Sequence, residues 1–256
     1  MRRKRIFIVL MLVAFLLSSI KGYCQKQAQM SVIWINEVPL SAQEKYEAVI
    51  KKQVQLLTKY QYNYPFYVFR TSDNFYYWIS PLENLNTLNK LYDEWGSLTL
   101  QMKQNDGFNH KKEFDGTTNY AKPVINILTE ELSYHPESPR FDHSKPYYVR
   151  WHFANVYYGK EDDFLKKHRQ YIEEFKKHKV ISGFETYIGS IGCETPYYIW
   201  MERYKNPKDL IETREKIFDE LGPEAIKIWK EMQKDIRKYE LRTGWYRDDL
   251  SYIPKE

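Results

Sequence analysis

The sequence predicts an α+β fold in which two successive β-α-β-β-α-β units close one barrel. Two kinds of observation support this. First, short motifs return in the same order: EELSYHP at 130–136 returns as DDLSYIP at 248–254, and KLYDEWG at 90–96 returns as KIFDELG at 216–222. Second, strand-like alternation and helix-like apolar spacing follow one another in the same order in both halves. An internal duplication explains these echoes.

The first half begins with a strand and a helix. Ser41 and Glu44 have the spacing of a capping box at the start of that helix. Pro81 is placed at the start of a second helix, and residues 96–123 are polar and weakly patterned. The expected elements are a strand at 30–38, a helix from 41 to about 57, a hairpin of 66–70 with 75–79, a helix at 81–95 and a strand at 124–129.

The second half repeats this order. Pro and polar residues are frequent at 135–146, which makes that stretch a plausible link between the halves. Pro223 is expected to begin a separate helix. The expected elements are a strand at 147–156, a helix at 161–177, a hairpin of 183–189 with 196–204, helices from 207 and from 223, and a strand at 241–247.

Each unit therefore reads as a ferredoxin-like repeat, and the predicted repeats span residues 25–139 and 140–256. A four-stranded sheet with helices on one face leaves its other face bare. Two copies can cover these faces and form a pseudo-dimeric α/β barrel, driven by burial of apolar area. The Leu-Ser-Tyr of each repeated motif would then occupy equivalent places, as a strand terminator with a packed aromatic ring rather than a catalytic group.

Residues 1–24 have the pattern of a signal peptide: four basic residues at 2–5 precede an apolar run at 6–20. We favour cleavage before Gln25. The alternative is a lipoprotein that keeps Cys24 as its lipidated residue. Either reading predicts an exported protein, periplasmic or extracellular, with no membrane span in the mature chain.

Removal of residues 1–24, which hold five basic and no acidic residues, changes the charge balance. The mature chain has 39 − 5 = 34 Lys and Arg against 34 Asp and Glu. A net charge near zero argues against a nucleic-acid partner. Cleavage also leaves Cys193 as the remaining cysteine, so no intrachain disulfide is expected.

Recognisable catalytic and metal motifs are absent from the sequence, and no metal site is predicted. The candidate ligand-pocket residues come from alternation instead. Arg150 and His152 share one strand face, opposite Val149 and Trp151, and that face is either a pocket wall or exposed to solvent. His168 is expected to face the sheet from its helix. The other candidates come from two strands, in which residues two apart share a face: Glu185 with Tyr187, and Trp200 with Glu202. If they line one cavity, Glu185 could act as a base and Arg150 as an anion clamp.

The order of elements and the tryptophan of each first strand, Trp34 and Trp151, resemble the dimeric α/β-barrel superfamily in its fused tandem form, and NIPSNAP-like members in particular. The resemblance covers about residues 28–254. The superfamily includes haem-degrading and cofactor-independent monooxygenases, haem-dependent enzymes and many members without known activity. In haem-binding relatives a helix histidine can ligate the iron, which is the role the resemblance implies for His168; the favoured alternative is a hydrogen-bonded histidine of the core.

Three functions remain open. The first is an exported, non-enzymatic barrel that binds a small apolar or aromatic ligand, or a partner protein, without a cofactor. The second is a monooxygenase-type enzyme acting on haem or an aromatic substrate, with haem as the alternative cofactor. The third is a packed structural barrel. The chain is expected to be a monomer with an internal pseudo-dimer, or a homodimer.

Overall fold

The computed structural model describes residues 30–138, 140–141 and 147–255. The predicted signal peptide lies outside them. The first half contains β1 (Met30–Glu37), α2 (Gln43–Lys59), β2 (Phe66–Thr71), β3 (Phe75–Leu82), α3 (Leu85–Asp106), α4 (His110–Glu113) and β4 (Tyr120–Leu128). The second half contains β5 (Tyr148–Val156), α5 (Glu161–Lys177), β6 (Phe184–Gly189), β7 (Tyr197–Tyr204), α6 (Pro207–Gln233) and β8 (Ile236–Tyr252). In the described residues, no helix is both long and apolar enough to cross a membrane.

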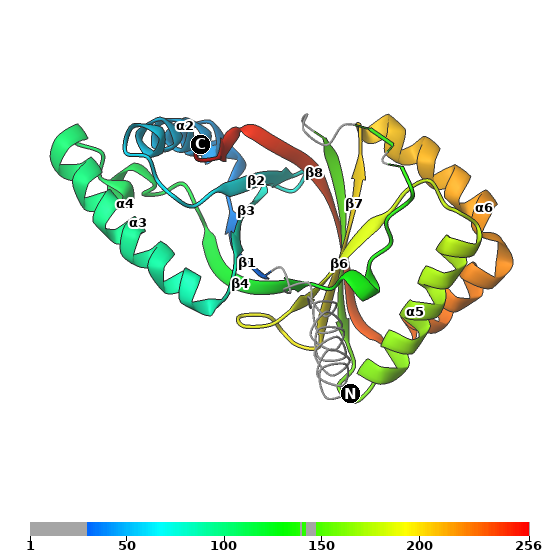
Figure 1. The fold of residues 1–256 in the computed structure, drawn as a ribbon. Coiled ribbons are helices and arrows are strands. Elements are labelled where there is room, and N and C mark those ends of the chain that lie inside the picture. The colour runs from blue at the N-terminus through cyan, green and yellow to red at the C-terminus, as the bar shows by residue number, and fades with distance from the viewer. Residues whose placement is uncertain (1–29, 139, 142–146, 256) are drawn as a thin grey trace, which may run out of the picture.

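Within these residues the strands close one barrel in the order β1-β3-β2-β8-β5-β7-β6-β4. The mixed α+β barrel expected from the sequence is therefore confirmed. Helices α2, α3 and α4 lie outside the barrel on one side, and α5 and α6 lie outside it on the other (Figure 1). Two pairings join the halves, β2 with β8 and β4 with β6.

Strand β8 is longer at both ends than the predicted 241–247. Its first part pairs with β5, as far as Trp245, and its last part pairs with β2, as far as Tyr252. It therefore crosses from one half of the barrel to the other (Figure 1). The beginning of this strand could not be predicted from apolar alternation, because residues such as Lys238 and Tyr239 are exposed.

The prediction that Pro81 opens a helix is wrong. Pro81 lies in β3, opposite Ser31 of β1. The pairing of β3 with β2 ends at Ile79, so the missing amide hydrogen of Pro81 leaves no ladder bond unmade on that side. Helix α3 begins after Asn84, whose side chain accepts from the backbone N–H groups of Asn86 and Thr87, and it extends through part of the weakly patterned stretch.

The predicted capping box is also wrong. Ser41 lies inside a 3₁₀ turn, Leu40–Ala42, and α2 begins at Gln43 with no side-chain cap. By contrast, α5 has the predicted bounds, Glu161–Lys177. In α6, Gly222 has a positive φ of 69°, which divides the helix just before Pro223, where a new helix was expected.

The repeated Leu-Ser-Tyr segments occupy corresponding places and bind across the two junctions between the halves. Ser133 Oγ accepts from the backbone N–H of Thr186 in β6 at 2.9 Å. Ser251 Oγ accepts from the backbone N–H of Val68 in β2 at 2.8 Å. Each hydroxyl also donates to the carbonyl four residues earlier. Each half therefore supplies a serine that completes the hydrogen bonding of the other half.

The adjacent tyrosines anchor the same segments. Tyr134 Oη donates to the carbonyl of Val180, just after α5, and Tyr252 Oη donates to the carbonyl of Tyr62, just after α2. Both rings are buried. The expectation of a strand terminator with a packed ring agrees with this placement.

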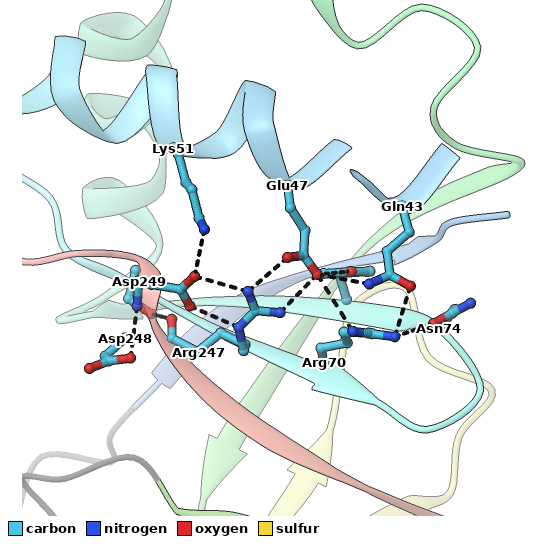
Figure 2. Close-up of polar contacts among 10 residues, drawn as sticks. Gln43, Glu47, Lys51, Arg70, Asn74, Arg247, Asp248 and Asp249 are labelled. Atoms are coloured by element: carbon cyan, nitrogen blue, oxygen red, sulfur yellow. Dashed lines mark hydrogen bonds and ion pairs between the residues drawn. The ribbon is translucent and has the colours of Figure 1, made fainter. Parts of the chain in front are cut away.

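An ion cluster fixes the end of β8 to α2 (Figure 2). Arg247 donates to both carboxylate oxygens of Glu47, at 2.8 and 2.7 Å, and to both oxygens of Asp249, at 2.8 and 2.9 Å. Tyr76 donates to Glu47 at 2.6 Å, and Lys51 lies 3.1 Å from Asp249. This cluster, the Arg247 clamp, joins the last strand of the second half to the first helix of the first half.

Candidate functional site

Three of the cavities lined by the described residues are of similar size. One, of about 270 Å³, lies inside the barrel. A second, of about 290 Å³, lies between the sheet and helices α5 and α6. A third, of about 300 Å³, lies between the sheet and helices α2, α3 and α4. The second cavity contains four of the six predicted pocket residues: Arg150, His152, His168 and Trp200.

Strand alternation places these side chains as the sequence indicated. On β5, Trp151 and Phe153 point into the barrel, whereas Arg150 and His152 point outward beneath α5 and α6. Aromatic and aliphatic side chains complete the wall of this α5/α6 cavity: Tyr171, Phe175, Phe184, Phe218, Leu221, Ala225, Ile226 and Trp229. The cavity is thus apolar apart from one cluster of charged and polar groups.

Arg150 is the central charge of that cluster. Its side chain is 12% exposed, and Nη1 lies 3.9 Å from Glu202 Oε2, beyond hydrogen-bonding distance. Among the described residues Nη1 has no hydrogen-bond partner. Burial lowers the pKa of the Arg150 guanidinium, although the nearby Glu202 raises it. The guanidinium is therefore incompletely satisfied.

Glu202 is shared among several partners. Its Oε2 accepts from Tyr204 at 2.9 Å and lies 3.7 Å from Arg214 of α6. His152 Nε2 is 3.3 Å from the same oxygen, but the groups are not aligned for a hydrogen bond. Burial raises the pKa of Glu202, but His152 and the two arginines outweigh burial and lower it to about 2. The carboxylate is therefore ionised at neutral pH.

His152 lies between a phenol and a carboxylate. Nδ1 forms a hydrogen bond with Tyr239 Oη from β8, and Nε2 faces Glu202. Burial raises the pKa of Tyr239 to about 12, so this phenol is protonated at neutral pH. Because Tyr239 Oη can donate, His152 Nδ1 can accept.

His168 lines the cavity, but its ring is fully buried and packed among other groups. Nε2 lies 2.9 Å from the Leu132 carbonyl and 3.2 Å from Trp200 Nε1. The shorter contact assigns the proton to Nε2, which donates to the carbonyl. The Phe164, Phe184 and Trp200 rings surround the imidazole, with centroids between 5.4 and 6.2 Å away. Burial lowers the pKa of His168 to about 4, so the ring is neutral at pH 7.

The haem alternative requires His168 to be an axial ligand of the iron. An axial ligand needs a nitrogen lone pair that faces open space. Nε2 of His168 faces the Leu132 carbonyl, and Nδ1 is buried without a partner among the described residues. The residues as placed do not fit haem ligated by His168. In the part of the chain that the structure describes, no group of three His, Cys, Asp or Glu side chains is placed to hold a metal ion.

The other two candidates, Glu185 and Tyr187, lie on the opposite face of the sheet. Tyr187 lines the cavity inside the barrel. Glu185 Oε2 accepts from Tyr187 at 2.6 Å and from Arg203 at 2.7 Å. The hypothesis that Glu185 acts beside Arg150 is wrong, because the two side chains emerge on different sides of the sheet.

The sequence did not identify Glu202, Arg214, Gln233 or Tyr239 as pocket residues, although all four line the α5/α6 cavity. Glu202 was noted only as the partner of Trp200 in alternation. Arg214 comes from α6 and Tyr239 from β8. No local pattern marks either residue, because both reach the cavity only when α6 packs and β8 closes the barrel.

Solved structures share this architecture. An anthrone oxidase-like protein matches with a TM-score of 0.63 and 10% identity over 91% of this chain and 95% of that chain. A proposed monooxygenase from Lactobacillus acidophilus NCFM matches with a TM-score of 0.52 and 8% identity, over 89% and 97%. A mutant chlorite dismutase from Candidatus Nitrospira defluvii matches with a TM-score of 0.53 and 6% identity, over 86% and 92%.

The fold is a dimeric α/β barrel. No protein-family model and no curated protein sequence matches this chain. At identities of 10% or less, the similarity to the barrels above is one of fold alone. Any activity of this dimeric α/β barrel must therefore be argued from its own side chains.

Proposed function

We propose that the protein binds a small aromatic or apolar molecule carrying one acidic group, in the cavity beneath α5 and α6. The observation that carries this proposal is Arg150, whose buried Nη1 has no hydrogen-bond partner among the described residues. A buried polar group without a partner is costly. A carboxylate can accept two parallel hydrogen bonds from a guanidinium, and the aromatic wall suits the remainder of such a molecule.

The charge of the cluster supports an anionic ligand. Glu202 faces both Arg150, at 3.9 Å, and Arg214, at 3.7 Å. One carboxylate beside two guanidinium groups leaves about one positive charge uncompensated in a mostly apolar site. A single acidic group on the ligand would balance it.

Binding of 2-naphthoate and of uncharged 2-naphthamide to residues 25–256 tests this proposal. Calorimetry and the fluorescence of Trp200 and Trp229 are the readouts. We expect naphthoate to bind at least about tenfold more tightly, and Arg150→Met to remove that preference. Arg169→Met is the matched control, because Arg169 is an exposed arginine of α5. Equal affinity for the two compounds, or a preference that survives in Arg150→Met, would contradict the proposal.

The contact between His152 and Tyr239 favours an oxygenase acting on a phenolic or enolisable aromatic substrate as a second candidate. If a substrate hydroxyl displaced the Tyr239 hydroxyl from His152 Nδ1, that nitrogen could accept the substrate proton while Glu202 stabilises the imidazolium. Because similar folds occur in an anthrone oxidase-like protein and a proposed monooxygenase, anthrone is the first substrate to test. Oxygen consumption with anthrone that falls in His152→Phe would support this candidate. No consumption above the rate without protein would leave binding as the function.

Two further parts of the proposal concern origin and location. We infer that the halves are two ferredoxin-like repeats from a duplication, as in NIPSNAP-like proteins; the corresponding bonds of Ser133 and Ser251 support this.

We also propose export through residues 1–24, on the charge and apolar pattern of that segment. Mass spectrometry of the secreted chain should find Gln25 as its first residue; a cytoplasmic chain that retains Met1 would contradict export.

A further inference from the structure

The cavity of the first half contains a buried amide with no partner. Gln53 lies on the inner face of α2, beside Ile50 and Leu57, and is fully buried. Neither its Nε2 nor its Oε1 forms a hydrogen bond to any residue that the structure describes. A buried polar group without a hydrogen-bond partner is destabilising, so this glutamine weakens the core unless something pairs with it.

The wall of this cavity defines what could pair with the amide. Aromatic rings line it, some from the sheet and some from the helices and the segments beside them: Trp34, Tyr46, Tyr62, Phe66, Trp78, Tyr92, Trp95, His110 and Phe114. No Asp, Glu, Lys or Arg is among the described residues of the lining. The cavity therefore favours a flat, uncharged molecule over a charged one.

Two of the other polar groups of the wall are paired with each other. Trp78 Nε1 donates to Tyr46 Oη at 2.9 Å. The His110 ring packs against Trp95 and Phe114, and burial lowers its pKa. Gln53 is a fully buried side chain of this wall, and its amide offers a ligand both a donor and an acceptor that have no partner among the described residues.

We propose that this cavity is a second binding site, for a flat, uncharged heteroaromatic molecule with a hydrogen-bond donor next to an acceptor on one edge. A lactam edge has this pattern, and it complements both atoms of the Gln53 amide. The site is independent of the α5/α6 cavity: it lies in the other half and shares none of its residues.

Three bicyclic probes of similar size test the proposal on residues 25–256: 2-quinolone, which has the lactam edge; quinoline, which lacks the donor; and naphthalene, which has neither group. Calorimetry measures affinity, and quenching of Trp34, Trp78 and Trp95 reports on the site. We expect 2-quinolone to bind at least about tenfold more tightly than the other two probes.

Two variants and a control connect this preference to the site. Gln53→Met should weaken 2-quinolone at least about tenfold, leave naphthalene within about threefold, and raise the melting temperature of the free protein. Gln55→Met is the matched control, because Gln55 is an exposed glutamine of the same helix. Ala121 is exposed and lines the same cavity, so Ala121→Trp should block all three probes without disturbing the core. Absence of 2-quinolone binding, equal affinity for the probes, or unchanged binding in Gln53→Met would overturn the proposal.

Discussion

His168 links local packing to the behaviour of the whole protein in acid. Its neighbours are apolar rings and a carbonyl, and the pKa of the ring is lowered to about 4 in the folded state, from 6.5 in the unfolded chain. The folded state therefore resists protonation that the unfolded state accepts. The stability that follows is complete above pH 6.5 and is lost as the pH falls towards 4.

We predict that the free energy of unfolding falls by roughly 3 kcal/mol between pH 7 and pH 4 because of this histidine alone. Urea unfolding of the wild type and of His168→Asn across that range measures the effect. The variant will be less stable at pH 7, but its stability should change less with pH. An equally steep pH dependence in the variant would assign the acid sensitivity to other groups.

The alternation of residues along the strands predicted only some of the site residues correctly. It placed Arg150 and His152 on one face and His168 towards the sheet, and all three line the same cavity. It could not say on which side of the sheet Glu185 would lie relative to them. Gln53 was missed for another reason: it interrupts an apolar helix stripe, and a sequence does not show whether such a residue is buried without a partner.

At the scale of elements, the geometry of the Arg247 clamp predicts a measurable contribution to the free energy of unfolding. The Arg247 and Glu47 side chains are 20% and 15% exposed, and they share two hydrogen bonds (Figure 2). Removal of one partner leaves the other charge partly buried and unpaired. The neighbouring Lys51 is 52% exposed and contributes little in such a position.

We predict that Arg247→Met or Glu47→Gln lowers the free energy of unfolding by about 2 kcal/mol, whereas Lys51→Met changes it by less than about 0.5 kcal/mol. Urea unfolding at neutral pH is the measurement, and the double variant Glu47→Gln/Arg247→Met gives the coupling between the two groups. Additive effects of the two substitutions would show that the clamp is not a unit.

Element boundaries were predictable where one helix or strand carries its own signal. Helix α5 has strong amphipathic spacing, and its bounds agree with the prediction. Helix α3 and strand β8 were predicted too short, since their outer ends are polar and depend on partners distant in sequence. Pro81 was assigned to a helix because the sequence alone does not reveal that one side of β3 lacks a neighbour there.

At the scale of the whole molecule, neither half is complete by itself. The pairings of β2 with β8 and of β4 with β6 close the sheet, and the interior of the barrel is shared. Separate fragments 25–139 and 140–256 should therefore each expose an apolar sheet face and aggregate. Expressed together, they should form one soluble complex with the circular dichroism and melting behaviour of the intact chain. A fragment that is soluble, folded and monomeric alone would contradict this.

The paired bonds of Ser133 and Ser251 have a consequence for assembly. Because each serine binds a strand of the other half, the same hydrogen bonds form whether the two halves belong to one polypeptide or to two. What favours closure within one chain is the high effective concentration that the connecting segment provides. Refolding from denaturant at millimolar protein should therefore trap exchanged dimers, each with two complete barrels, while dilute refolding should return monomers that size-exclusion chromatography separates from them.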